Sequence, residues 1–259
     1  RAEAYDLAVA ILLNTLELIE DNFEGDAYVK YEIISQLGEI NALLGSYGEA
    51  EYLYEYSISN IKKFNKNNPY IENIELKLAE VYINQARFEE ANYLINKHAN
   101  SIYNNEDTIL RIAELLKQNK QYKNAEEIIL SVLDRKKEYL ANNKIESINF
   151  INFRFKAFLA DLYDKQYLFS KASTYYEDIL ANHISELKGK YISKAKFFNS
   201  LGFNSMAKGN FSAAEEFLKA SLEIYNLIPQ KSNSITETYS SLALLYSLNG
   251  NTNEAFFYY

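Results

Sequence analysis

The chain has 259 residues, of which 48% are hydrophobic and 24% charged, and it carries a net charge of −8 at pH 7. This composition is typical of a folding chain rather than a disordered one, and the negative charge disfavours nucleic-acid binding because it repels phosphate. The absence of cysteine excludes disulfides and thiolate metal sites, and no apolar run is long enough to predict a membrane span.

The first predicted element is a helix over residues 2–20, which carries apolar residues nearly all round. A helix of this kind needs neighbours on both sides. Its Glu-Ala pair at residues 3–4 echoes the Glu-Ala pair at residues 49–50. We therefore predict that residues 1–24 form the second helix of a preceding partial repeat.

Beyond this helix, one unit recurs six times with constant internal spacing. Each unit contains a large residue followed by a small one: Leu37-Gly38, Leu78-Ala79, Ile112-Ala113, Leu159-Ala160, Leu201-Gly202 and Leu242-Ala243. Twelve residues after each small residue stands an alanine: Ala50, Ala91, Ala125, Ala172, Ala214 and Ala255. Self-similarity of this kind is the sequence signature of a repeat architecture.

The small residues predict two antiparallel helices per unit, since helices approach closely only where a side chain is small. The large-small pair lies on the first helix and the alanine lies on the second. Gly45, Gly209 and Gly250 stand seven residues after the small residue, where a helix end favours a residue tolerant of positive φ. Lys120 and Tyr167 occupy this place in two other units, so glycine is favoured there but not required.

This pattern resembles the tetratricopeptide repeat, whose first helix reads large-x-x-large-small-x-x-Tyr and whose second reads Ala-x-x-x-aromatic. Residues 159–163 and 172–176 carry the resemblance, which covers residues 26–259. Successive alanines lie 34 to 47 residues apart, similar to long repeats of the kinesin-light-chain type. The resemblance implies an all-α fold, a right-handed α-α superhelix (solenoid) of antiparallel helix pairs.

We expect about six repeats in this solenoid, at residues 26–64, 70–104, 105–142, 145–184, 190–228 and 233–259. The first residue is Arg1, the only methionine is Met206, and the chain stops within a second helix. We therefore expect the solenoid to be truncated at both ends.

The sequence carries no recognisable catalytic constellation. His98 and His183 are too far apart for a local metal-ligand motif, and we predict that both are packing residues. The segment 188–190 (Lys-Gly-Lys) lacks the upstream glycine of a phosphate-binding loop, so we interpret it and the nearby lysines as solvated. We predict no catalytic residue, no cofactor and no metal site, and hence that the protein is not an enzyme.

One series of positions indicates a binding surface. The residue directly after each small residue should face the concave groove that stacked first helices line: Glu39, Glu80, Glu114, Asp161, Phe203 and Leu244. Four carboxylates followed by two apolar residues predict a partly acidic groove, which would attract a basic or amphipathic protein or peptide. The alternative interpretation is that these are ordinary solvated helix charges, since glutamate is a good helix former.

Solenoids of this kind usually bind other molecules, so we predict a scaffold that binds a protein or peptide. The resemblance leaves a second interpretation open: a regulatory or sensor segment of a larger bacterial protein, such as a peptide-sensing regulator or a caspase-like peptidase effector. Neither interpretation involves nucleic acid or a membrane span. The absence of cysteine leans toward the cytoplasm.

Overall fold

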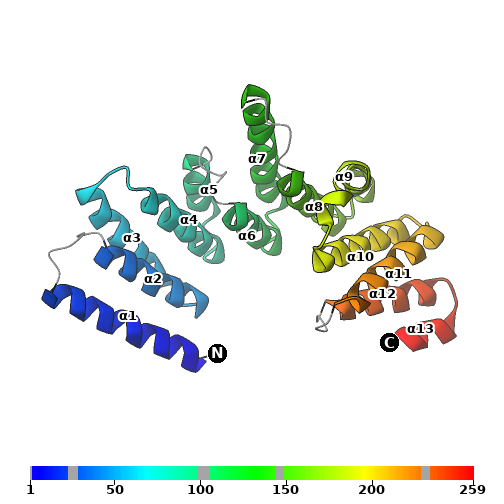
Figure 1. The fold of residues 1–259 in the computed structure, drawn as a ribbon, viewed down its shortest axis with the longest axis horizontal. Helices are drawn as coiled ribbons and strands as arrows, with labels where there is room; N and C mark the ends of the chain where they lie inside the picture. The colour runs from blue at the N-terminus through cyan, green and yellow to red at the C-terminus, as the bar shows by residue number, and fades with distance from the viewer. Residues whose placement is uncertain (1, 23–28, 99–105, 144–148, 229–233) are drawn as a thin grey trace. The chain divides into compact units, whose positions relative to one another are not determined.

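The computed structural model describes residues 2–22, 29–98, 106–143, 149–228 and 234–259, and within these ranges the chain is helical without strands. Figure 1 shows the helices in chain order. Their bounds are α1 Ala2–Asn22, α2 Val29–Leu43, α3 Tyr47–Phe64, α4 Pro69–Asn84, α5 Phe88–Lys97, α6 Glu106–Gln118, α7 Tyr122–Asn143, α8 Asn149–Lys165, α9 Phe169–Asn182, the 3-10 turn η2 Ile184–Leu187, α10 Tyr191–Ala207, α11 Phe211–Asn226, α12 Ile235–Leu248 and α13 Thr252–Tyr258.

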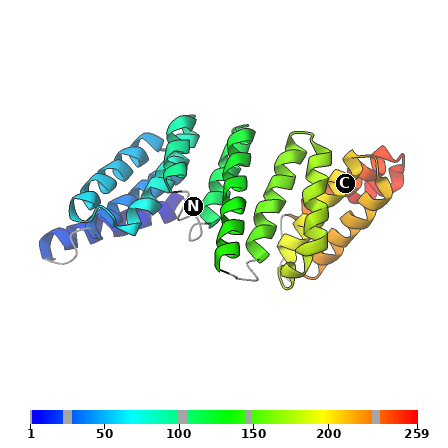
Figure 2. The ribbon, with the colours of Figure 1, turned by 90° about the horizontal axis from the view of Figure 1, so that it is seen from above.

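The chain divides into two compact units, Arg1–Ile128 (unit 1) and Ile129–Tyr259 (unit 2), with the division inside α7. In unit 1, α2 pairs with α3 and α4 pairs with α5, while α4 also contacts α3 and α6. In unit 2, α8 pairs with α9, α10 with α11 and α12 with α13. Figure 2 shows α10 and α11 side by side. The predicted all-α architecture of helix pairs is thus confirmed.

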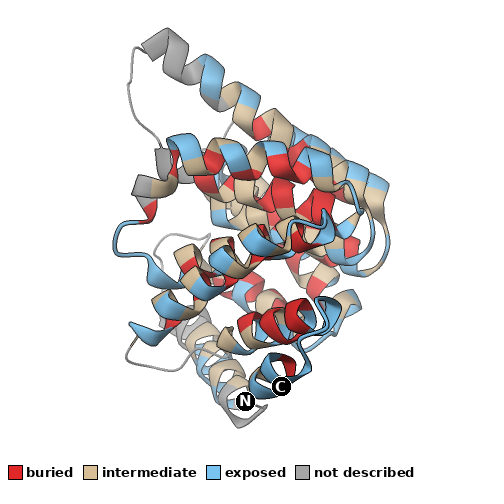
Figure 3. Cartoon of the chain, turned by 90° about the vertical axis from the view of Figure 1, so that its right-hand side faces the viewer, coloured by how far each residue is buried: buried red, intermediate tan, exposed pale blue. Residues whose placement is uncertain are grey.

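The large-small pairs lie on α2, α4, α6, α8, α10 and α12, and the repeated alanines lie on the helices that follow them. Five of these alanines are completely buried, and Ala255 is 4% exposed. At Gly38, an added Cβ would lie 3.0 Å from the Tyr54 ring and 3.4 Å from the Ala50 carbonyl oxygen. The predicted close approach of the two helices therefore occurs, and buried residues line their facing sides (Figure 3).

The turn between the two helices has the same geometry in every pair. In the α10–α11 turn, the Asn210 amide donates to the Ser205 carbonyl at 2.9 Å, and the Gly209 amide donates to the Met206 carbonyl at 2.9 Å. This is the Schellman arrangement, which needs one left-handed residue after the helix. The residues with positive φ at this place are Gly45, Ala86, Lys120, Tyr167, Gly209 and Gly250. A residue tolerant of positive φ was predicted at the three glycines, and Ala86, Lys120 and Tyr167 adopt positive φ at the same place without being glycine.

Two local sequence features mark the start of helix α4. The Asn68 side chain accepts a hydrogen bond from the Tyr70 amide at 2.9 Å and caps the N-terminus. Pro69 is the first helical residue, where the missing amide hydrogen would have had no helical partner. The other proline, Pro229, lies outside the described residues.

Candidate functional site

The six predicted groove residues each lie on a first helix. Glu39, Glu80 and Glu114 belong to α2, α4 and α6 of unit 1. Asp161, Phe203 and Leu244 belong to α8, α10 and α12 of unit 2. The four carboxylates are half-buried, and Phe203 and Leu244 are each 40% exposed. Each residue therefore retains some access to solvent.

Within unit 1, the carboxylates are joined to cations of the next first helix. Lys77 Nζ of α4 lies 2.5 Å from the Glu39 carboxylate of α2. The Arg111 guanidinium of α6 lies over the Glu80 carboxylate of α4, with an Nη2–Oε1 distance of 2.7 Å. The geometry repeats, because Lys77 and Arg111 each stand two residues before the small residue of their helix. Sequence reasoning did not identify these cations, although their shared position relative to the small residue was a usable signal.

The third carboxylate of unit 1 finds its cation on its own helix. Lys117 Nζ lies 2.6 Å from Glu114, three residues earlier on α6. Glu39, Glu80 and Glu114 are therefore each paired with one basic residue, and the row alternates in sign. We name this row of three carboxylates and their cations the paired row.

The members of the paired row differ in how open they are. The Glu80 side chain is 18% exposed, whereas Glu39 is 46% and Glu114 is 43% exposed. Burial raises the pKa of Glu80, and hydrogen bonds from Arg111 oppose this rise. Beneath the row, burial and the nearby carboxylates Glu39 and Glu80 also raise the pKa of the Tyr54 phenol. Glu80 therefore mainly connects α4 to α6 through Arg111. The more exposed Glu39 and Glu114 carboxylates can still accept hydrogen bonds from solvent.

Beside the paired row lies an open cleft of about 500 Å³ between α1, α2 and α4. Its lining is mainly apolar, with Glu39 and Lys77 in one wall: Ala8, Ile11, Leu12, Gln36, Glu39, Ile40, Leu43, Tyr70 and Lys77. A cleft of this size can receive a few apolar side chains of a ligand.

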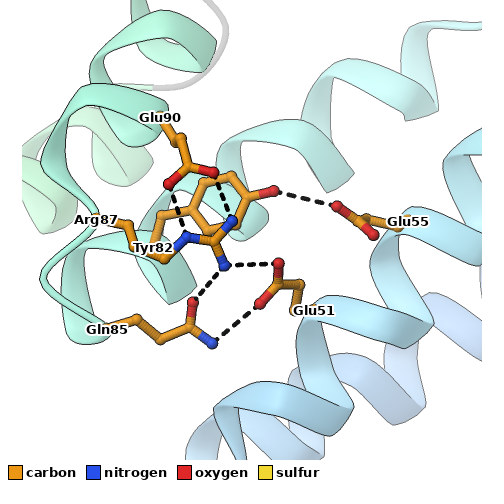
Figure 4. A network of polar contacts seen from close by, with 6 residues as sticks. All are labelled: Glu51, Glu55, Tyr82, Gln85, Arg87 and Glu90. Carbon is orange, nitrogen blue, oxygen red and sulfur yellow. Dashed lines mark hydrogen bonds and ion pairs between the residues drawn. The ribbon is translucent and has the colours of Figure 1, made fainter.

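A second polar network joins α3 to the α4–α5 turn (Figure 4). Arg87 lies over the Tyr82 ring at 4.2 Å and bonds Glu51 of α3 at 2.6 Å and Glu90 of α5 at 2.5 Å. The Tyr82 hydroxyl donates to Glu55 of α3 at 3.2 Å. Each charged group here is engaged with another protein group, so the network links neighbouring repeats.

The two histidines, which were predicted to be packing residues, instead make polar contacts with charged side chains, and among the described residues no group of three or more His, Asp or Glu side chains could hold a metal ion. His98 Nε2 lies 2.5 Å from Glu75, and His183 Nε2 lies 2.8 Å from Lys156 Nζ. Lys188 and Lys190 are exposed just before α10. Over the part of the chain that the structure describes, no helix is both long and apolar enough to cross a bilayer.

Comparison with known proteins gives structural neighbours. No family model matches the sequence, and no curated protein matches it. A putative kinesin light chain from Podosopora anserina with nearly identical TPR-like repeats matches at a TM-score of 0.55 and 17% identity, over 77% of this chain and 96% of that one. A tetratricopeptide repeat protein from Parabacteroides merdae matches at a TM-score of 0.55 and 16% identity, over 99% of this chain and 88% of that one.

The apo form of the quorum sensor NprR from B. thuringiensis matches at a TM-score of 0.51 and 11% identity, over 100% of this chain and 83% of that one. At these identities the likeness establishes the fold. The helix pairs, the small-residue contacts and these neighbours together identify this chain as having the fold of tetratricopeptide-repeat proteins with long, kinesin-light-chain-like repeats.

Proposed function

We propose that this chain is a scaffold that binds a protein or peptide along the exposed residues of its first helices. The observation that carries the proposal is the repeated placement of partly exposed residues after each small residue, with Glu39 and Glu114 open in unit 1. In unit 2, Phe203 and Leu244 add apolar side chains at the same place on their helices.

The paired row bears on the chemistry of the partner. A carboxylate has about four lone-pair positions. Lys77 at Glu39, and Lys117 with Gln118 at Glu114, occupy only part of that capacity. A Lys or Arg of the partner could therefore add to either carboxylate without displacing its neighbour. Because the row already contains cations, long-range attraction should be weak, and contacts with apolar residues should supply much of the affinity. We propose an amphipathic partner with a few basic residues.

Peptides selected from a random display library against the whole chain test the proposal. The selected peptides should combine apolar residues with Lys or Arg, and the Glu39→Gln/Glu114→Gln variant should bind them about fivefold more weakly, as expected for partly exposed charge contacts. Gln is preferable to Lys here, because a lysine would face Lys77 or Lys117 and disturb the row itself.

The matched control is Glu127→Gln, which removes a carboxylate from the second helix α7, where the side chain is 63% exposed. This variant should leave binding unchanged. Selected peptides that are acidic, or that bind the two variants equally, would contradict the proposal. The regulatory interpretation uses the same surface, so the same variants test it.

A further inference from the structure

The turn between α8 and α9 differs from the other five turns within helix pairs in the residues at its tip. In those turns, the left-handed residue and the residue after it are small or polar: Gly45-Ser46, Ala86-Arg87, Lys120-Gln121, Gly209-Asn210 and Gly250-Asn251. In the α8–α9 turn they are Tyr167, which is 81% exposed, and Leu168, which is 41% exposed. Two large side chains with apolar surface therefore meet solvent at this one turn.

Both residues are unfavourable for the turn itself. Tyr167 has a φ of 61°, in the left-handed region that a bulky side chain rarely adopts. Leu168 is the N-cap of α9 and gives the helix no side-chain hydrogen bond. In the α10–α11 turn, by contrast, the Asn210 side chain caps α11 by accepting from the Ala213 amide at 3.3 Å. A strained and exposed residue pair of this kind indicates a role other than folding.

Three exposed lysines lie around this turn. Lys165 is the last residue of α8. Lys171 belongs to the first turn of α9, and its Nζ lies 5.2 Å from the centroid of the Tyr163 ring of α8. Lys208 follows α10, and its Nζ donates to the Ser173 hydroxyl of α9 at 2.9 Å. The lysines thus come from both sides of the α8–α9 turn and from the neighbouring α10–α11 turn.

No exposed carboxylate balances these lysines within the two turns. In residues 162–173 and 204–214, the single acidic residue is Asp164. Asp164 is only 9% exposed, and its carboxylate accepts from the Asn204 amide group at 2.6 Å and from the Tyr176 hydroxyl at 2.8 Å. Among the described residues, no carboxylate lies within ion-pair distance of any of the three lysines. A chain with a net charge of −8 therefore carries a locally positive surface here.

We propose that Tyr167 and Leu168 anchor an acidic segment of a partner protein, whose apolar residues pack on these two side chains and whose carboxylates meet the lysines. We call this surface the basic tip, and its members are Lys165, Tyr167, Leu168, Lys171 and Lys208. Exposed tyrosines are frequent anchors of protein interfaces, and the uncompensated positive charge selects an acidic partner.

The charge of the whole chain favours a short protein segment over a membrane. An anionic bilayer extends well beyond the basic tip and would also meet the acidic surfaces of a chain whose net charge is −8. A short acidic segment contacts the basic tip alone. The basic tip contains none of the six groove residues and takes a partner of the opposite charge, so this site goes beyond the proposed function.

The variant Tyr167→Gly/Leu168→Asn tests the anchor, because it gives the α8–α9 turn the two residues of the α10–α11 turn. It removes the left-handed strain and supplies a helix cap, so its melting temperature should rise. Peptides from a random display library are depleted on this variant and then selected against the whole chain. The surviving peptides should combine Asp or Glu with apolar residues.

Fluorescence anisotropy of the selected peptides then tests the lysines. Lys165→Gln/Lys171→Gln should weaken binding about fivefold and reduce its dependence on salt. The matched control Lys188→Gln, which removes an exposed lysine just before α10, should have no effect. The groove variant Glu39→Gln/Glu114→Gln should also leave this binding unchanged, which separates the basic tip from the proposed function.

Three results would overturn the proposal. The first is that no peptide survives the depletion, or that the survivors lack acidic residues or bind the lysine variant unchanged. The second is a lower melting temperature for Tyr167→Gly/Leu168→Asn, which would assign both side chains to the fold itself. The third is binding of the chain to vesicles of equal parts phosphatidylserine and phosphatidylcholine that the same variant abolishes, since the basic tip would then bind a membrane.

Discussion

In unit 1, ion pairs join one repeat to the next, whereas in unit 2 hydrogen bonds to the Asp164 carboxylate and aromatic contacts do much of this. The centre of the unit 1 contacts is Glu75 of α4, which is 3% exposed. Its carboxylate lies 3.0 Å from Lys62 of α3 and 2.5 Å from both Lys97 and His98 at the end of α5. Burial alone would raise the pKa of Glu75, but hydrogen bonds from His98, Lys97 and Lys62 lower it to about 2.

Unit 2 buries a different kind of network. Asn204 of α10 is 2% exposed, donates to Asp164 of α8 at 2.6 Å and accepts from Ser173 of α9 at 2.9 Å. The Tyr176 hydroxyl donates to the other Asp164 oxygen at 2.8 Å. No cation bonds this carboxylate among the described contacts, and burial raises the pKa of Asp164.

Aromatic rings complete the unit 2 contacts. The Phe197 ring of α10 lies 5.8 Å from Phe153 of α8 and 5.9 Å from Tyr176 of α9, both edge to face. The two units share their small-residue contacts and turns, and they differ in the side chains that connect successive pairs. The repeat geometry therefore constrains packing within a pair, while contacts between pairs tolerate varied chemistry.

The largest expected effect comes from removing the buried carboxylate of unit 1. Glu75→Gln leaves Lys62 and Lys97 without their anion, so it should cost about 3 kcal/mol. Asp164→Asn in unit 2 should cost only about 1 kcal/mol, because an amide can still hydrogen-bond Asn204 and Tyr176. Native-state hydrogen exchange in α3–α5 and α8–α10 measures each loss separately. Equal losses at the two sites would remove the distinction between the units.

Acid titration is the control for this comparison. The folded pKa of Glu75 lies below its ordinary value of 4.5, so its stabilising contribution is complete above pH 4.5 and is lost as the pH falls toward 2. The pH dependence of the Asp164 contribution has the opposite sign. The folded pKa of Asp164 is raised, so its contribution to stability decreases as the pH rises above 3.8, the ordinary pKa of an aspartate. The difference between wild type and Glu75→Gln should therefore shrink below pH 4.5.

An intermediate effect is expected at the small residue of α10. A Cβ at Gly202 would lie 2.6 Å from Leu218 Cγ and 3.2 Å from the Ala214 carbonyl oxygen. Gly202→Ala should therefore cost about 2 kcal/mol through overpacking, measured by urea unfolding. Gly38→Ala is the matched control in unit 1, where the nearest atom is 3.0 Å away on the Tyr54 ring, and it should cost less. A smaller cost at Gly202 than at Gly38 would contradict this account.

The smallest expected effect concerns the turns, which both units share. Lys120 has a φ of 60° and is exposed, so Lys120→Gly should relieve the left-handed strain and stabilise the chain by about 1 kcal/mol. Gly209→Ala should destabilise it by a similar amount, since Gly209 has a φ of 80° and open space around it. Thermal unfolding followed by circular dichroism measures both. A lower melting temperature for Lys120→Gly would show that its side chain contributes more than the strain costs.

The sequence alone determined the helix pairs, the close contacts and the turns. These features depend on residues a short distance apart: the small residue, the alanine twelve positions later and the turn between them. The six groove residues could also be placed on first helices, because a fixed offset from the small residue selects one face of a helix.

Only the tertiary structure decided which charged side chains form ion pairs with one another. Lys77 binds Glu39 from 38 residues away, and Arg111 binds Glu80 from 31 residues away. These pairs depend on how one helix pair packs on the next, which the internal spacing of a repeat does not specify. The burial of Glu75 likewise follows from three helices meeting around one carboxylate, because neighbouring cations must compensate the loss of water.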